Sequence, residues 1–360
     1  MSLRELRRHA GRLAIAGFSG HSVPDDLRRL IAEFDLGGVI YFARNVVEPA
    51  QLLELSREVA ALARHWPFWI SVDQEGGRVA RLKSPFTEWP PAITLGRSGD
   101  PALAERFATA LAAELSAVGI NLDYAPVLDV HTNPANPVIG DRALAVEAEL
   151  AARLGAAIVR ALQAGGVAAC GKHFPGHGDT SVDSHESLPV VDHDPRRLDA
   201  VELVPFKRAI AGGVAAIMTA HVLVPALDEH APATFSKAIV TGWLKETLQF
   251  GGLVMSDDLG MKGATSFTQP SDELLSAISA GCDLGLLCNS TADEQVTAIE
   301  TVIRAAEDGR LSQKRIDDAF ARQKQAKERF LTPRPGKPLS LDVVGCGEHH
   351  AVAQEMAAWR

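Results

Sequence analysis

Residues 253–261 read Leu-Val-Met-Ser-Asp-Asp-Leu-Gly-Met, a short apolar run that leads into two adjacent carboxylates. A continuous apolar run of this length is typical of a strand that is buried on both faces, as the strands of parallel sheets are. Seven further runs of this kind occur along the chain. We therefore expect eight buried strands, at residues 12–18, 38–42, 68–72, 121–125, 167–171, 215–220, 253–256 and 284–288.

Amphipathic segments lie between most of these runs and repeat their apolar residues at helical spacing. Alternating strands and helices favour the α/β class and, with eight strands, a single (β/α)8 TIM-type barrel. A doubly wound open sheet is the alternative, but Gly17-Phe18-Ser19-Gly20 after the first run lacks the full glycine-rich dinucleotide fingerprint. The helices are expected at residues 49–64, 101–118, 145–164, 195–211, 237–250 and 292–308.

One large domain accounts for most of the chain. We expect the barrel to span residues 1–335 and residues 336–360 to form a C-terminal tail or helix that packs on it. The Pro-rich segment 332–338, Thr-Pro-Arg-Pro-Gly-Lys-Pro, is the expected linker between the two.

Bulk properties exclude several classes of function. The chain has 360 residues, 46% of them hydrophobic, and a net charge of -9 that is spread along it, so no nucleic-acid footprint is expected. No apolar stretch is long enough for a membrane span or a secretory signal. The four cysteines lack CxxC spacing and are expected to be free thiols. We expect a cytoplasmic monomer without metal or cofactor.

Charged residues gather just past the expected strand ends, where barrel enzymes carry their sites. The third run leads into Asp73 and Glu75, the fifth into Lys172 and His173, and the seventh into Asp257. Four of these residues have a structural alternative. Asp257 could be a helix cap, Lys172 and His173 could be core contacts, and Glu75 could be the partner of Arg78. Likewise, Arg81 and Arg142 could pair with surface acids. Five such rim positions together favour a site.

The loop after the fifth run is rich in glycine and proline, which predicts an irregular, shaped segment. Asp183 and His185 are two residues apart and share a face of an extended backbone. A carboxylate beside an imidazole orients the ring and stabilises its protonated form, which suits a general acid/base near neutral pH. The alternative is that Asp183 caps a turn and His185 is solvated. Within this loop we favour the acid/base pair.

Four motifs together resemble glycoside hydrolase family 3 β-N-acetylglucosaminidases of the bacterial peptidoglycan-recycling type. They are Asp-Gln-Glu-Gly-Gly-Arg-Val at 73–79, Lys-His-Phe-Pro-Gly-His-Gly at 172–178, Asp-Ser-His at 183–185 and Ser-Asp-Asp-Leu-Gly-Met at 256–261. The similarity runs from about Leu13 to about Phe330.

The resemblance implies a retaining exo-β-N-acetylglucosaminidase that acts on muropeptides or chitooligosaccharides. It makes Asp257 the nucleophile, His185 the acid/base and Asp183 the partner of His185. A histidine in this role departs from the usual pair of carboxylates. The residues implied to bind the sugar and its N-acetyl group are Asp73, Arg81, Arg142, Lys172 and His173.

Three other functions remain open at this stage. A histidine acid/base repels phosphate less than a carboxylate does, so the enzyme could be a phosphorylase of the same linkage. Zinc-dependent barrel hydrolases usually have a histidine pair after the first strand, and Gly17-Phe18-Ser19-Gly20 offers none. A silent sugar-binding protein would have lost a catalytic residue, but Asp257, Asp183 and His185 are all present. The zinc site would draw on His173, His177, Asp183, His185 and His221.

Overall fold

The computed structural model describes residues 3–183, 188–269, 271–332 and 340–360. Eight parallel strands close into a barrel in the spatial order β1-β10-β9-β8-β7-β6-β3-β2, which confirms the (β/α)8 prediction. The barrel strands are β1 (Ala14–Gly17), β2 (Gly38–Tyr41), β3 (Trp69–Val72), β6 (Leu122–Asp123), β7 (Ala168–Phe174), β8 (Ala216–Thr219), β9 (Leu253–Asp258) and β10 (Leu284–Leu287).

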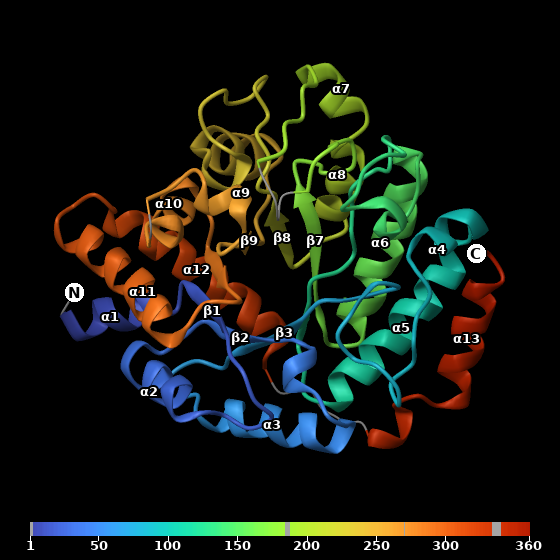
Figure 1. The fold of residues 1–360 in the computed structure, drawn as a ribbon, viewed down its shortest axis with the longest axis horizontal. Helices are drawn as coiled ribbons and strands as arrows, with labels where there is room; N and C mark the ends of the chain where they lie inside the picture. The colour runs from blue at the N-terminus through green and yellow to red at the C-terminus, as the bar shows by residue number, and fades with distance from the viewer. Residues whose placement is uncertain (1–2, 184–187, 270, 333–339) are drawn as a thin grey trace.

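Helices surround the strands, as Figure 1 shows. In the first half of the chain they are α1 (Leu3–Gly11), α2 (Asp25–Phe34), α3 (Pro49–Ala61), α4 (Ile93–Ser98), α5 (Pro101–Ala117) and α6 (Ala148–Ala164). In the second half they are α7 (Pro195–Ala200), α8 (Leu203–Ala211), α9 (Lys262–Thr265), α10 (Glu273–Ala280), α11 (Ala292–Glu307), α12 (Gln313–Phe330) and α13 (Gly347–Ala357). Short 3₁₀ turns are η1 (Ala43–Asn45), η2 (Gly140–Arg142), η3 (Ala233–Phe235) and η5 (Leu341–Val343), and η4 (Ala238–Thr247) is a π-helix.

Pairing between the first and last strands closes the barrel. Ala14 pairs with Gly285 and Ala16 with Leu287 in parallel register. The strands approach so closely beyond this point that a Cβ on Gly17 would lie 2.0 Å from the carbonyl oxygen of Cys288. Glycine is therefore required at position 17 for closure.

Two strands run further than the sequence predicts, and both carry site residues. β7 continues through Lys172 and His173, and β9 continues through Asp257 and Asp258. Neighbouring strands supply backbone partners there, because Asp258 is in register with Leu286 of β10. These charged residues are thus the last residues of barrel strands, not the first residues of loops.

Several elements differ from the expected ones. The expected helix at 195–211 is divided into α7 and α8, and the one at 237–250 is the π-helix η4. A small antiparallel hairpin, β4 (Gln74–Gly76) and β5 (Val79–Ala80), follows β3 and was not predicted. Its turn places Gly76 at φ 97° and Gly77 at φ 57°, conformations that favour glycine. Strands this short leave too little periodicity to detect.

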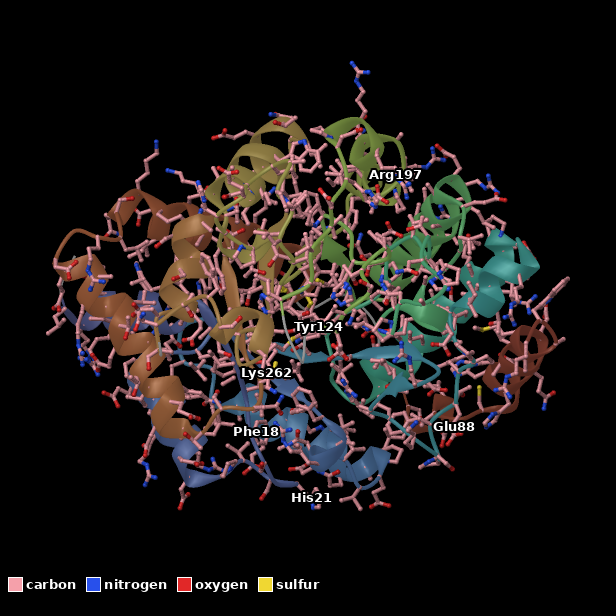
Figure 2. All side chains as sticks on the ribbon, turned by 45° about the horizontal axis from the view of Figure 1, so that its top comes forward. Phe18, His21, Glu88, Tyr124, Arg197 and Lys262 are labelled. Atoms are coloured by element: carbon pink, nitrogen blue, oxygen red, sulfur yellow. The ribbon has the colours of Figure 1, made fainter. Side chains whose placement is uncertain are left out.

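The inside of the barrel is filled with side chains. Trp69, Tyr124 and Met255 are fully buried within it, and the Tyr124 hydroxyl lies 2.9 Å from Ser71 Oγ. Figure 2 shows Tyr124 in the middle of the molecule, whereas the exposed His21 and Glu88 lie at its edge. The barrel is therefore a packed core, and the space for chemistry is at its rim.

Helix α12 closes the opposite, amino-terminal face of the barrel. Gln323 Nε2 donates to the carbonyls of Arg12 and Asp283, each at 2.9 Å, and Lys327 Nζ donates to the carbonyl of Gly37 at 2.9 Å. Lys327 is buried, and its ammonium lies 5.3 Å from the centroid of the Trp66 ring. Burial, together with the positive charge of Arg12, lowers the pKa of Lys327 to about 7.

The C-terminal helix α13 packs against α5 and α4, and Figure 1 shows it beside them. The buried carboxylate of Glu114 anchors this segment: its Oε1 accepts the N–H of Gly345 at 3.1 Å and lies 2.8 Å from His349 Nδ1. The predicted boundary between residues 335 and 336 lies outside the described residues and stays a prediction. Within the described part of the chain, no helix has the length and apolarity needed to cross a bilayer.

All four cysteines are free, as expected. Cys170, Cys282 and Cys288 are buried, and Cys346 is half-buried.

The low pKa of Lys327 predicts a pH-dependent contribution to stability. Lysine in an unfolded chain titrates near about 10.4. Between about pH 7 and pH 10 the unfolded chain therefore binds a proton that the folded protein lacks, so folding stability rises with pH in this window. Lys327→Met removes this titration. We expect wild-type stability to rise relative to the variant by on the order of 1–2 kcal/mol between about pH 7 and pH 9.

Chemical denaturation of both proteins at the two pH values, followed by circular dichroism, measures the difference. The difference in stability between wild type and variant cancels the contributions of the other titrating groups. If the two proteins respond to pH in parallel, the ammonium of Lys327 stays charged in the folded state and its assigned environment is wrong.

Candidate active site

Lys172 links β7 to the segment that follows β3, at the carboxyl-terminal rim of the barrel. Its ammonium lies 2.7 Å from Asp73 Oδ1 and 2.7 Å from Glu75 Oε1, and the side chain is only 2% exposed. Burial would lower the pKa of Lys172, but the two carboxylates outweigh burial and raise it. The ammonium therefore stays charged, and Asp73 and Lys172 lie together as predicted.

Glu75 is the centre of this cluster. Arg142 donates to both of its oxygens, from Nε and Nη2, each at 2.8 Å. Burial would raise the pKa of Glu75, but Arg142 and Lys172 hold it below its usual value. A fully buried carboxylate that binds two cations keeps both in fixed geometry.

The structural alternative, in which Glu75 pairs with Arg78, is wrong. Arg78 lies in the exposed turn of the β4–β5 hairpin, and its Nε donates to Asp141 at 3.1 Å. Glu75 faces the interior, where Arg142 and Lys172 satisfy both of its oxygens. The two residues are close in sequence but on opposite sides of a tight turn.

Arg81 lies at the edge of the same cluster. Its Nη2 is 3.6 Å from Asp73 Oδ2, and its guanidinium lies 5.4 Å from the centroid of the Phe42 ring. Gln74 Oε1 accepts the backbone N–H of Arg81 at 2.8 Å and thereby holds the hairpin strands together. The structure thus brings Asp73, Arg81, Arg142 and Lys172 into one cluster through direct contacts.

His173 is held by a residue that the sequence did not single out. The buried carboxylate of Asp129 lies 2.6 Å from His173 Nδ1 and accepts the backbone N–H of His173 at 3.1 Å. It also accepts the N–H of His177 at 2.6 Å. Because Nδ1 is engaged, Nε2 is the ring nitrogen that His173 can offer to another partner. A Cβ on Gly178 would lie 1.8 Å from the Val130 carbonyl oxygen, so glycine is required where this loop packs behind Asp129.

Asp257 is the half-buried penultimate residue of β9. Its Oδ1 accepts the backbone N–H of Asp258 at 2.7 Å. Burial would raise the pKa of Asp257, but His173, His221 and that amide outweigh burial and lower it. The carboxylate is therefore ionised at neutral pH, as a nucleophile must be. The helix-cap alternative does not describe Asp257, because the carboxylate interactions with loop amides belong to Asp258.

The predicted acid/base pair is only partly described. Asp183 is half-buried in the loop after β7, whereas His185 lies outside the described residues. Beyond that gap the loop returns across the rim: the Val191 N–H donates to the Leu223 carbonyl at 2.8 Å, and the Leu223 N–H donates to the Pro189 carbonyl at 2.8 Å. Residues 189–191 are therefore tied to the segment that follows β8. The role of His185 stays a prediction.

A zinc site requires several ligand side chains close together in the part of the chain that the structure describes. No group of three or more His, Cys, Asp or Glu side chains there could hold a metal ion. His221, one member of the suggested zinc set, instead lies between the carbonyl of Asp258 and the hydroxyl of Thr234.

Sequence reasoning missed the roles of Glu75 and Asp129. Both are acidic residues directly adjoining buried strands, and burial of an unpaired charge is costly. That cost is a signal that each must have a cationic or amide partner. It does not say which partner, because the partners come from distant parts of the chain.

Comparisons with known proteins identify the family of this chain. The family model described as glycosyl hydrolase family 3 N terminal domain matches residues 6–325. The β-hexosaminidase of Nitrosomonas eutropha is 40% identical over 288 residues, which are 78% of this chain and 82% of that protein. The β-hexosaminidase A of Pseudoalteromonas piscicida is 35% identical over an alignment of 364 positions, which covers 93% of this chain but only 60% of that longer protein.

Solved structures give the same family. A family 3 β-N-acetylglucosaminidase from Paenibacillus sp. str. FPU-7 is 42% identical and superposes with a TM-score of 0.92 over 100% of this chain and 69% of that one. NagZ from Neisseria gonorrhoeae, solved with N-trifluoroacetyl-D-glucosamine, is 31% identical with a TM-score of 0.78 over 96% of this chain and 97% of that one. This chain therefore belongs to glycosyl hydrolase family 3.

Proposed function

We propose that this protein is a retaining exo-β-N-acetylglucosaminidase, with Asp257 as nucleophile and His185 as general acid/base. The observation that carries the proposal is the ionised carboxylate of Asp257, held at the barrel rim beside the Lys172 and His173 cluster. The β-hexosaminidase names of the family relatives support the activity. The pattern Asp183-Ser-His185 supports the acid/base assignment.

The reaction proceeds in two displacements. An oxygen of Asp257 attacks the anomeric carbon, and the bond to the leaving oxygen breaks while His185 gives that oxygen a proton. In the second step a water attacks the anomeric carbon, His185 takes its proton, and Asp257 leaves. Two inversions give net retention. Asp183 orients the imidazole of His185 in both steps.

Fixed hydrogen-bond donors hold the sugar. The Lys172 and Arg142 cations are already oriented by Glu75, and His173 is oriented by Asp129, so binding need not reorganise them. Asp73 and Arg81 complete the set with an acceptor and a donor at the same rim. We assign the hydroxyls and the N-acetyl group of a terminal N-acetylglucosamine to these five residues.

The proposal extends to the context of the enzyme. Free cysteines suit a reducing compartment, so we place the protein in the bacterial cytoplasm as a monomer. Its substrates there are small carbohydrates, either muropeptides or chitooligosaccharides. Assays with both, in the presence and absence of phosphate, identify the preferred leaving group and separate hydrolysis from phosphorolysis.

Leaving-group dependence separates the two catalytic roles. A dinitrophenyl glycoside needs little proton donation, so His185→Ala should form the covalent intermediate from it in a burst and then turn over slowly. The same variant should fail on a glycoside with a poor leaving group, and azide should restore turnover of the trapped intermediate. Asp257→Ala should show no burst and lose several powers of ten in rate. Stopped-flow absorbance measures both.

His193→Ala is the matched control, because His193 lies in the same loop but pairs with Asp179. It should keep the wild-type dependence on the leaving group. Equal loss of rate on all substrates without a burst in His185→Ala would mean that this histidine positions substrate and does not transfer protons.

Specificity for the N-acetyl group is the second expectation. A substrate without the N-acetyl group leaves the buried hydrogen-bond donors of the site without a partner. Such a site rejects that substrate strongly. With a common nitrophenyl leaving group, kcat/KM for the β-N-acetylglucosaminide should exceed that for the β-glucoside by at least about a hundredfold. Steady-state kinetics on the two substrates tests this, and equal values would refute the assigned role of the cluster.

A further inference from the structure

His221 is buried beside the proposed nucleophile but takes no part in the mechanism above. It lies two residues beyond the end of β8 and has no exposed surface. Its Nε2 lies 3.0 Å from the carbonyl oxygen of Asp258, and its Nδ1 lies 2.9 Å from the hydroxyl of Thr234. Both ring nitrogens are therefore engaged, one of them by the backbone next to Asp257.

The contact with Asp258 fixes the tautomer of His221. A carbonyl oxygen can only accept, so Nε2 must carry a proton and donate it. Burial lowers the pKa of His221. The Thr234 hydroxyl next to Nδ1 also lies 3.0 Å from the carbonyl oxygen of Ala220, which accepts its hydrogen. The Thr219 hydroxyl lies 2.9 Å from that of Thr234 and can donate to it in turn. The direction of the bond from His221 Nε2 to the Asp258 carbonyl is fixed, because the carbonyl can only accept.

Asp258 is anchored from its side chain as well. Oδ1 accepts the N–H groups of Gly260 and Cys288, each at 3.1 Å. Oδ2 accepts from Asn289 Nδ2 at 3.1 Å. These bonds tie the end of β9 to the end of β10, so the side chain of Asp258 is a fixed structural link.

The remaining polar group of Asp258 holds the nucleophile. Its backbone N–H donates to Asp257 Oδ1 at 2.7 Å, which occupies one carboxylate oxygen and leaves Oδ2 to attack. The direction of Asp257 therefore depends on where the backbone of Asp258 lies. His221 holds that backbone at the carbonyl, and the β10 contacts hold it at the side chain.

We propose that His221 is a positioning residue for the nucleophile, which holds the Asp258 carbonyl and thereby sets the orientation of the Asp257 carboxylate. This inference rests on the role of Asp257 proposed above. It is distinct from packing, although the His221 ring also stacks on Phe235 with centroids 6.0 Å apart.

The test compares two variants of nearly equal shape. In His221→Gln the side-chain amide can still donate to the Asp258 carbonyl, whereas His221→Met has no donor. A small misplacement of a reacting group costs up to about a hundredfold in rate. We expect the burst rate constant on a dinitrophenyl β-N-acetylglucosaminide to fall about tenfold or more in His221→Met and to stay within about threefold of wild type in His221→Gln.

Binding and packing are measured in parallel. The inhibition constant of free N-acetylglucosamine should stay within about threefold of wild type in both variants, since ground-state binding uses other residues. Phe235→Leu removes the ring stack but leaves both His221 hydrogen bonds, so it should lower stability and keep the burst rate.

Each outcome decides the matter. Equal slowing in His221→Gln and His221→Met, or a wild-type burst rate in His221→Met, overturns the positioning role. If His221→Met does not fold, His221→Gln decides alone: a burst rate constant that falls about tenfold or more although the donor is retained overturns the positioning role. Absence of a burst in the wild-type protein rejects the covalent mechanism itself, which is a separate failure.

Discussion

Closure of the barrel between β1 and β10 is the constraint on which the rest of the structure depends. A Cβ at Gly17 would strike the Cys288 carbonyl, so a single glycine permits the strands to meet. Once the sheet is closed, all eight strands end at one rim in parallel. Charged residues that are far apart in the sequence then lie within a few ångströms of one another. They stay at the rim because packed side chains fill the interior of the barrel below them.

Paired charges stabilise this rim and also keep its cations oriented for binding. Lys172 and Arg142 are buried cations, and each would be costly without a partner. Asp73 and Glu75 supply the partners at 2.7–2.8 Å, so the cost is offset and the cations are held in place. The same arrangement leaves preoriented donors around an ionised Asp257. A site of this kind can bind an uncharged sugar without moving its own groups.

Two adjacent aspartates show how neighbours in sequence take different tasks. Asp257 keeps an accessible oxygen and a pKa lowered by surrounding cationic and amide groups against the effect of burial. Burial instead raises the pKa of Asp258, whose oxygens accept from Gly260, Cys288 and Asn289. The first can react, and the second holds the loop. His221 and the ends of β8 and β10 make this division, and they lie elsewhere in the chain.

Local sequence patterns were enough to predict the class of fold and most candidate residues. The apolar runs and their helical spacers are local patterns, and local burial is what produces them, so eight strands and the rim positions of Asp73, Lys172, His173 and Asp257 followed directly. Only the tertiary structure decided the partners. Glu75 binds Arg142 and Lys172 instead of Arg78, Asp129 holds His173, and His221 holds Asp258. Two groups form an ion pair or a hydrogen bond only when they lie about 3 Å apart. Barrel closure, and not separation along the chain, determines which groups come that close.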